Sequence, residues 1–183
     1  MTPDDPGRAR MPDEHTLSIE WKTRGYRMIN VQIPGRSDLV IESILLDVNG
    51  TLALDGELVE GVAERVGQLR KLARLVILTA DTHGGATRLG EYLGLEVVLL
   101  DPHEGAPQKL KRLLDLDADS SATIGNGAND VLILERSALG ICVVGREGAS
   151  TEALLKADIV VTDIRDALDL FLNPRRVAAT LRK

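Results

Sequence analysis

Three short apolar segments of this sequence are each followed at once by residues that could do chemistry. The first leads into Asp47, Asn49, Gly50 and Thr51, the second into Thr79, Ala80 and Asp81, and the third into the run GNGAND at 125–130. An ionised aspartate can act as a nucleophile or a cation ligand, and a threonine hydroxyl can donate a hydrogen bond. Single groups of this kind are ordinary turn formers, but three of them in this order favour a functional site.

The elements that must position these residues alternate between strands and helices. Continuous apolar runs predict parallel strands buried on both faces, and they occur at 42–48, 75–79, 95–100, 122–125, 139–144 and 158–161. Helical spacing of apolar residues predicts helices between them, at 61–73, 86–95, 106–116, 129–138 and 150–157. This alternation predicts a three-layer α/β/α sandwich with a doubly wound, mostly parallel sheet, whose ligands bind at the carboxyl ends of the strands.

The length and the N-terminal composition suggest one domain with an extension. A chain of 183 residues that is 44% hydrophobic can bury one full core. Residues 1–27 are polar and lack periodicity, so we expect a disordered extension before a domain at 28–183. Alternating side chains at 28–34 predict a strand at the sheet edge. Because regular patterning begins there, Met28 could be the true start of the protein.

Charge and composition argue against several classes of partner. The formal net charge of -6 and the lack of a long Lys/Arg run disfavour nucleic acid and anionic membranes. There is no signal-peptide core and no apolar stretch of the roughly 20 residues that span a bilayer, so we expect a cytoplasmic protein. The single cysteine, Cys142, is expected to be a small buried hydrophobe, and an aromatic content of 2% disfavours base stacking.

Four segments resemble the motifs of the haloacid dehalogenase (HAD) superfamily. They are LLDVNGTLALDG at 45–56, VILTADT at 76–82, Lys109 after a short loop, and ATIGNGANDVLIL at 122–134. Within that superfamily, the TAD and GNGAND segments, IPGR at 33–36 and GREGASTEALLKADIVV at 145–161 are similar to the soluble P-type ATPases. The resemblance implies a Rossmann-like fold and a magnesium-dependent phosphohydrolase or phosphotransferase.

The resemblance also implies a role for each site residue. Asp47 would be the nucleophile that forms an aspartyl phosphate. Thr79 would donate its hydroxyl to a phosphoryl oxygen, and Lys109, with Lys111 as the alternative, would neutralise phosphoryl charge and hold Asp47 ionised.

Magnesium and phosphate ligands follow from the same resemblance. Mg²⁺ would be bound by Asp47, the backbone carbonyl of Asn49 and the side chain of Asn126, with support from Asp130 outside the ligand shell. The remaining residues expected around the phosphate are Gly50, Thr51, Ala80 and Asn129.

Asn49 and Asn126 stand where the superfamily usually has aspartate. An amide at Asn49 cannot exchange a proton, so we expect slow turnover of poor leaving groups, less effect on acyl phosphates or nucleotides, and a persistent phosphoenzyme. An amide at Asn126 removes one negative charge and should lower the affinity for the metal. The alternative is a catalytically degenerate relative that binds phosphate, a nucleotide or a protein partner.

Other polar residues have ordinary explanations beside functional ones. Asp81 could contact a nucleotide but suits a helix cap, His83 and His103 suit exposed loops, and Asp55 suits a turn in a short flap at 53–57. Only 27 residues separate Thr51 from Thr79, which leaves no room for a cap domain. We therefore expect an open site for a small phosphorylated substrate or nucleotide, and a possible homo-oligomer.

Overall fold

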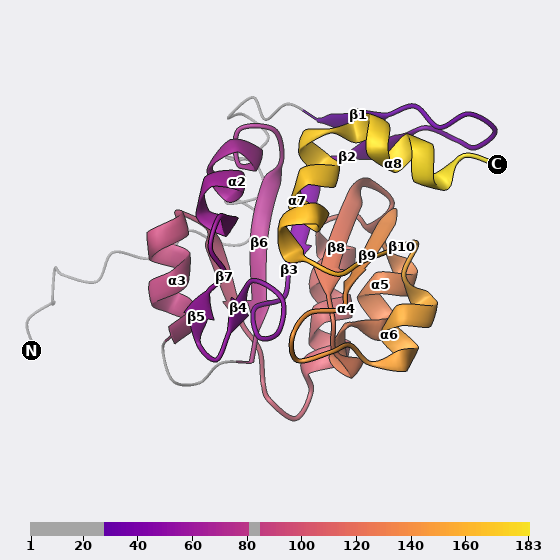
Figure 1. Cartoon of the computed structure of the whole chain (residues 1–183). Coiled ribbons are helices and arrows are strands. Elements are labelled where there is room, and N and C mark those ends of the chain that lie inside the picture. The colour runs from indigo at the N-terminus through magenta and orange to yellow at the C-terminus, as the bar shows by residue number, and fades with distance from the viewer. Residues whose placement is uncertain (1–27, 81–84) are drawn as a thin grey trace, which may run out of the picture.

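Six parallel strands form the centre of the molecule (Figure 1). The computed structural model describes residues 28–80 and 85–183. The strands lie in the order β10-β9-β8-β3-β6-β7, with the bounds β3 Ser43–Leu46, β6 Arg74–Thr79, β7 Glu96–Leu99, β8 Ser121–Gly125, β9 Leu139–Val143 and β10 Ile159–Val161. Each strand overlaps an apolar run that predicted it, so the predicted parallel α/β sheet is confirmed.

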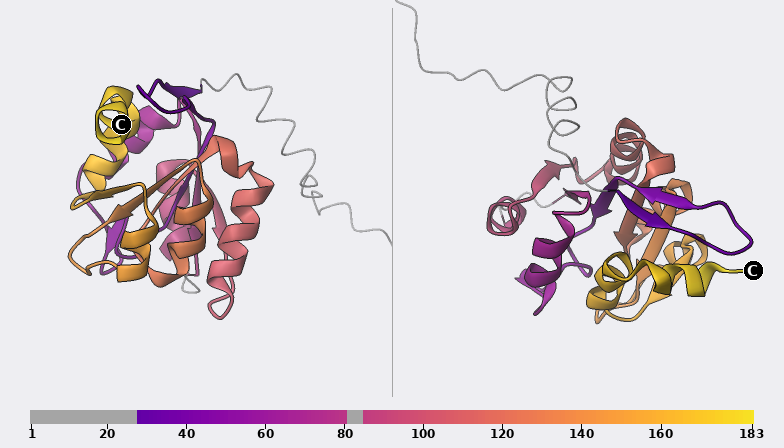
Figure 2. Two further views of the ribbon diagram at one scale, coloured as in Figure 1. Left: turned by 90° about the vertical axis from the view of Figure 1, so that its right-hand side faces the viewer. Right: turned by 90° about the horizontal axis from the view of Figure 1, so that it is seen from above.

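Helices cover both faces of this sheet (Figures 1 and 2). One face carries α2 Val62–Leu69, α3 Gly85–Leu93 and α7 Ile164–Leu172, and the other carries α4 Gly105–Asp115, α5 Val131–Arg136 and α6 Thr151–Lys156. Two 3₁₀ turns, η1 Ala118–Ser120 and η2 Ala128–Asp130, flank β8, and α8 Pro174–Leu181 closes the chain. The three predicted layers are therefore present. Across the described residues, no helix is both long and apolar enough to cross a membrane.

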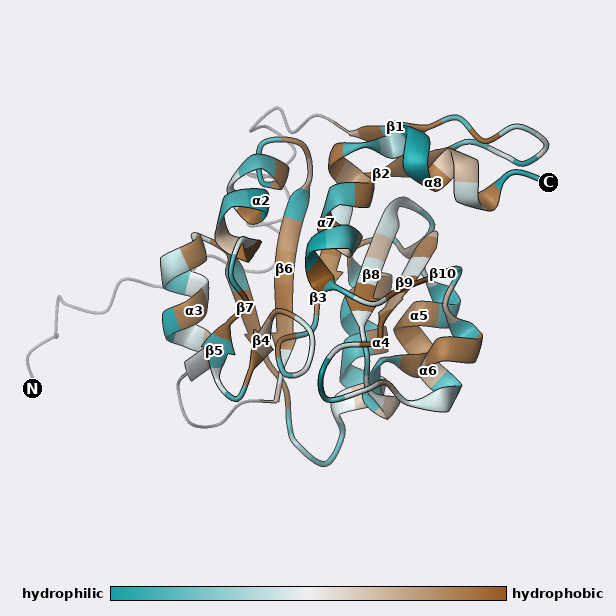
Figure 3. Ribbon diagram, viewed as in Figure 1, coloured by the Kyte–Doolittle hydropathy of each residue, from teal (hydrophilic) through white to brown (hydrophobic). Residues whose placement is uncertain are grey.

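Burial on both faces explains why the central strands are continuous apolar runs. In β3, Ile44 and Leu46 belong to the apolar cluster under α2 and α7, whereas Leu45 packs with Leu113 of α4 on the other face. Successive side chains of a strand point to opposite faces, so a strand covered twice needs apolar residues at every position. Figure 3 shows the same pattern in β6, which is hydrophobic over most of its length. Cys142 of β9 is fully buried, as expected.

The N-terminal strand does not lie where the sequence predicted it. β1 Ile29–Val31 pairs antiparallel with β2 Leu39–Ile41 in a separate two-stranded sheet, so its placement at the edge of the main sheet was wrong. Ile29 and Val31 are buried in the same apolar cluster as Val177 of α8. The alternating apolar side chains of β1 are thus buried against α8, and β1 does not join the main sheet.

A short hairpin, called the flap below, takes the place that a cap domain could occupy. Its strands are β4 Ala53–Leu54 and β5 Glu57–Leu58, and Asp55 and Gly56 at the turn have φ of 52° and 81°. Positive φ at both central residues is what a tight two-residue hairpin turn requires. In the second possible position only residues 100–104 separate β7 from α4. The described chain therefore carries no cap domain.

Asp163 caps α7, and its removal should weaken the fold. Its Oδ1 accepts the Arg165 N–H at 2.8 Å, and the hydrogen bond from the Arg165 side chain lowers the pKa of the Asp163 carboxyl below its ordinary value of 3.8. We expect Asp163→Ala to lower the free energy of unfolding by about 0.5–2 kcal/mol, measured by urea unfolding near neutral pH.

The pH dependence provides the check on this cap. Because the folded-state pKa is depressed, the ionised carboxylate stabilises the fold above pH 3.8 and loses this effect as the pH falls through the folded-state pKa. The difference between wild type and Asp163→Ala should therefore shrink below pH 3.8. Asp163→Asn, which keeps a cap acceptor, should lose less stability; equal losses would contradict the capping role.

Candidate active site

Asp47, Lys109 and Asp130 form a chain of two ion pairs at the carboxyl ends of β3 and β8. Asp47 directly follows β3, and its backbone N–H donates to the Ile124 carbonyl of β8 at 3.0 Å. Lys109 reaches this point from α4, and its Nζ lies 2.6 Å from Asp47 Oδ1 and 2.6 Å from Asp130 Oδ1. Side-chain exposure is 1% for Lys109, 11% for Asp47 and 0% for Asp130, so these charges interact away from bulk water.

The electrostatics of this cluster depend on the single ammonium group. Burial and the charge of Asp130 raise the pKa of the Asp47 carboxyl to about 7, while the charge and hydrogen bond of Lys109 lower it. Burial lowers the pKa of Lys109, but the two carboxylates outweigh it and the pKa rises overall. Two carboxylates and one ammonium leave a net negative charge when all three are ionised. Lys109 thus opposes the protonation of Asp47 that burial favours.

Asp130 has both carboxylate oxygens engaged within the protein. Oδ1 accepts from Lys109, and Oδ2 accepts the backbone N–H groups of Asn126 at 3.0 Å and Gly127 at 2.9 Å. These bonds hold the turn after β8 and orient Lys109 at the same time. The geometry therefore gives Asp130 a positioning role beside the site.

Thr51 brings Asp47 and Asn126 together. Its Oγ1 lies 3.2 Å from Asn126 Oδ1 and 3.5 Å from Asp47 Oδ2, and one hydroxyl proton serves only one acceptor at a time. The Asn126 amide nitrogen donates to the Gly148 carbonyl at 3.4 Å, which turns Oδ1 toward Thr51. A carboxylate oxygen and an amide oxygen thus lie around one point beside the nucleophile candidate.

These oxygens fit a hard divalent cation with few charged ligands. The two hydrogen bonds of the bridge around Asn49 run from the Ala53 N–H to the Val48 carbonyl and from the Gly50 N–H to the Ala53 carbonyl, both at 2.9 Å, so neither of them uses the Asn49 carbonyl. Such oxygen ligands suit Mg²⁺ and similar ions. In the described part of the chain, no three His, Cys, Asp or Glu side chains gather into a metal site. Asp47 would therefore be the one charged protein ligand, and a phosphate would supply the rest.

Gly50 and Thr51 shape the loop rather than offering their amides. Gly50 N–H donates to Ala53 and Thr51 N–H donates to Val48 at 3.1 Å, so both backbone donors are used inside the turn. Gly50 has φ of 73°, and a Cβ there would lie 2.4 Å from the Asn126 amide nitrogen. Glycine is needed at this position so that Asn126 can approach the loop.

The other predicted phosphate-site residues lie at neighbouring strand ends. Thr79 is buried at the end of β6, which pairs with β3, and Ala80 follows it half-buried. Asn129 is exposed on η2, beside Asp130. The sheet order therefore brings these segments to the same edge as Asp47.

Several alternative candidates are placed away from the cluster. Lys111 is 73% exposed and pairs with Asp115 at 2.9 Å, so the lysine in the site is Lys109. His103 is exposed in the loop before α4. Asp81 and His83 fall outside the described residues.

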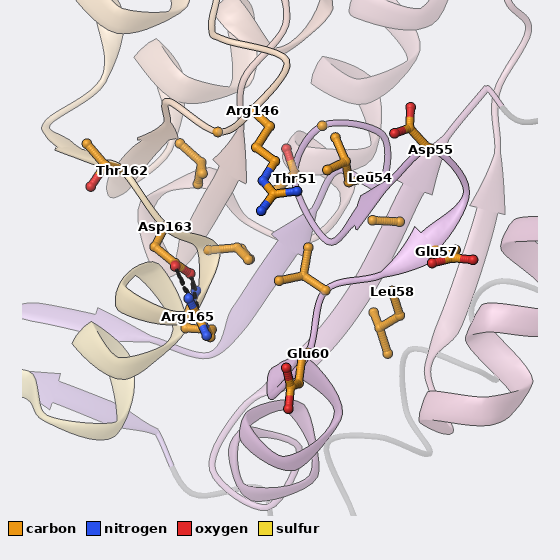
Figure 4. A pocket seen from close by; sticks show the side chains of 16 residues that line it. Thr51, Leu54, Asp55, Glu57, Leu58, Glu60, Arg146, Thr162, Asp163 and Arg165 are labelled. Atoms are coloured by element: carbon orange, nitrogen blue, oxygen red, sulfur yellow. Dashed lines mark hydrogen bonds and ion pairs between the residues drawn. The ribbon is translucent and has the colours of Figure 1, made fainter.

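A pocket of about 480 Å³ opens beside the loop of Asp47, and the sequence analysis did not identify it (Figure 4). Gly50 and Thr51 form part of its wall, and the flap, the turn at 145–148 and the start of α7 form the rest. Arg146 of that turn points into the pocket. The glycines that bracket Arg-Glu in GREG were the available signal of a tight turn.

Two proteins of Methanocaldococcus jannaschii are related in sequence, although no protein-family model matches the chain. An uncharacterized protein is 51% identical over 78 residues, which cover 40% of this chain and 84% of that protein. A soluble P-type ATPase-like phosphatase is 29% identical over 137 residues, which cover 73% of this chain. The match spans 50% of that phosphatase's length.

Solved structures share the fold at low sequence identity. A protein described as a HAD superfamily (subfamily III A) hydrolase from Legionella pneumophila has a TM-score of 0.58 at 23% identity, over 77% of this chain and 87% of that one. The 3-deoxy-D-manno-octulosonate 8-phosphate phosphatase from Moraxella catarrhalis, solved with magnesium, phosphate and KDO, has a TM-score of 0.59 at 17% identity, over 76% and 90%. A cobalt-bound phosphatase for the same type of substrate from Haemophilus influenzae has 0.59 at 16%, over 78% and 94%.

Removing Lys109 should destabilise the fold because it leaves two buried carboxylates without a counter-charge. We expect Lys109→Met to lower the free energy of unfolding by about 3–5 kcal/mol in urea unfolding. The double variant Lys109→Met with Asp130→Asn should recover part of this loss, since it removes one of the repelling charges. Lys111→Met is the matched control and should stay within about 0.5 kcal/mol of wild type. A Lys109→Met protein as stable as this control would refute the buried ion pairs.

Proposed function

Because the chain belongs to the haloacid dehalogenase superfamily of phosphatases and hydrolases, we propose that it hydrolyses phosphorylated small molecules through an aspartyl phosphate on Asp47. The observation that carries this proposal is the asymmetric environment of that carboxylate. Oδ1 is held by Lys109 at 2.6 Å, while Oδ2 faces Thr51 beside the pocket. One oxygen is thus fixed by Lys109, and the other faces Thr51, which forms part of the pocket wall.

The reaction divides into two displacements at phosphorus. In the first, Asp47 Oδ2 forms a bond to phosphorus while the bond to the leaving oxygen breaks, and that oxygen takes its proton from solvent. In the second, water attacks the acyl phosphate, which frees Asp47 and inorganic phosphate. Lys109 favours the ionised form of Asp47 that the first step needs, and it would offset charge on the phosphoryl oxygens.

A divalent cation, which we propose to be Mg²⁺, would be held by Asp47, the Asn49 carbonyl and Asn126. Bound there, it would neutralise charge on the phosphoryl group. Its support is the set of oxygens around Thr51 and the presence of magnesium or cobalt in the two similar phosphatase structures. With only one charged protein ligand, the cation should bind more tightly together with a phosphate than alone.

In this proposal, Asn49 makes the rate of the first displacement depend on the stability of the leaving group. Its exposed amide can donate a hydrogen bond but cannot transfer a proton, so a poor leaving group must depart without a general acid. Acyl phosphates and nucleotides, whose leaving groups are stable anions, depend less on that help. A second candidate function, a binding protein without turnover, is favoured by the same residue together with Asn126.

Phosphate release with an Asp47 control tests the proposal. Wild-type protein with Mg²⁺ should release phosphate from acetyl phosphate fastest, from p-nitrophenyl phosphate next and from glycerol 3-phosphate slowest. Asp47→Asn should abolish all three activities, and folding of the variant is checked by circular dichroism. Equal activity in both proteins would exclude Asp47 as the nucleophile, and no activity in either would leave the binding function.

Restoring an acid at position 49 should speed the slow substrate selectively. We expect Asn49→Asp to raise kcat on glycerol 3-phosphate by up to about 10²–10⁴-fold, the range that general acid–base catalysis supplies. Turnover of acetyl phosphate serves as the internal control and should change little. A uniform change on both substrates would mean that residue 49 does not act on the leaving group.

A further inference from the structure

Arg146 is a positively charged side chain in the lining of the pocket beside the Asp47 loop, and it is available to a ligand. The residues lining the pocket include one other arginine, Arg165, whose guanidinium is paired with Asp163. Arg146 makes no hydrogen bond or ion pair with any residue that the structure describes, and its side chain points into the pocket (Figure 4). A planar guanidinium presents paired donors that suit a carboxylate or a phosphate.

The backbone that carries Arg146 is fixed to the site. Gly148 N–H donates to the Gly145 carbonyl at 2.9 Å and closes the tight turn at 145–148. A Cβ on Gly145 would lie 3.2 Å from the Gly50 carbonyl oxygen, so the turn packs directly on the loop after Asp47. The Gly148 carbonyl also accepts from Asn126. The position of Arg146 relative to the nucleophile is therefore set by the fold.

The rest of the pocket suits the carbon skeleton of a leaving group. Its volume of about 480 Å³ lies within the range of small-molecule sites, and Leu54, Leu58 and Ile164 contribute apolar walls. Of the acidic residues that line the pocket, Asp163 is paired with Arg165, Glu60 lies at the opposite end from Arg146, and Asp55 and Glu57 belong to the flap (Figure 4). Glu147, the chain neighbour of Arg146, does not line the pocket, although its carboxylate lies against Gly50. An anionic group would thus be favoured at the Arg146 end, and hydroxyl groups could donate to Glu60.

We propose that Arg146 selects phosphate esters whose leaving group carries a second anionic group, a carboxylate or another phosphate. This rests on the proposed function, because the ester phosphate is taken to lie at Asp47. With that phosphate at the loop of Gly50 and Thr51, the leaving group extends into the pocket toward Arg146. The flap covers one side of it, and solvent remains at the other.

Binding measurements on an inactive background test this without requiring turnover. In the Asp47→Asn protein with Mg²⁺, titration calorimetry would compare 3-phosphoglycerate with glycerol 3-phosphate, which differ by a carboxylate. It would also compare fructose 1,6-bisphosphate with fructose 6-phosphate, which differ by a phosphate. Each ligand is titrated into the background protein and into the same protein with Arg146→Ala, Arg146→Lys or Arg36→Ala. Arg36, an exposed arginine in the β1–β2 connection, is the matched control.

The expected result is a loss confined to the ligand of each pair that carries a second anionic group. Arg146→Ala should weaken binding of 3-phosphoglycerate, of fructose 1,6-bisphosphate or of both by about 10- to 100-fold, as expected for hydrogen bonds to a charged group. The ligand with a single anionic group, glycerol 3-phosphate or fructose 6-phosphate, should bind with the same affinity before and after the change. Arg146→Lys should lose part of the effect, and Arg36→Ala should lose none. A larger loss of affinity for 3-phosphoglycerate would identify a carboxylate as the preferred second group, and a larger loss for fructose 1,6-bisphosphate would identify a phosphate.

Equal affinities with and without Arg146 for both pairs would overturn the proposal. Failure of the background protein to bind either 3-phosphoglycerate or fructose 1,6-bisphosphate at millimolar concentration would overturn it as well. Failure of the proposed function gives a different result. Phosphate release would then be independent of Asp47, whatever the binding measurements show. If binding depends on Arg146 but phosphate release does not depend on Asp47, the proposed role of Arg146 in ligand binding stands and the proposed catalytic role of Asp47 is wrong.

Discussion

The buried ammonium group of Lys109 is the interaction on which the rest of the site depends. It contacts two carboxylates that come from the ends of two adjacent strands, and its helix lies across the sheet from the flap. Without it, burial and mutual repulsion would protonate Asp47 or push the two strand ends apart. Asp47, the turn after β8 and Lys109 of α4 therefore have to assemble together, because each supplies a charge that the others need.

The sequence predicted the parts of the molecule that local patterns determine. Asp47 follows an apolar run that must be a buried strand, so its place at the sheet edge could be predicted, as could the Asp55–Gly56 turn. Lys109 was found by resemblance, since nothing local separates it from Lys111; only packing of α4 shows which of the two is buried. β1 was misplaced because alternation predicts a half-buried strand without naming its partner.

The pocket could not have been found in this way, because its walls come from distant parts of the chain. The Gly145 turn is set against Gly50 by a contact across 95 positions, and the flap meets the start of α7 only in the folded molecule. In the proposed function, Asn49 and Asn126 make the site depend on its substrate. The phosphate would supply most of the negative charge around a cation, and the leaving group would have to depart without a general acid.

The turn at 145–148 also bears on how such a protein could diversify. Its shape is held by Gly145 and Gly148 and by bonds to the Asn126 loop, whereas the side chain of Arg146 is exposed and takes no part in the apolar core. A substitution of this exposed side chain should carry little risk to folding, and in the proposed binding mode it would change which ligands the pocket prefers. Ligand preference and the shape of the turn would then depend on different residues of one four-residue segment, so related chains could acquire new substrates through single substitutions there.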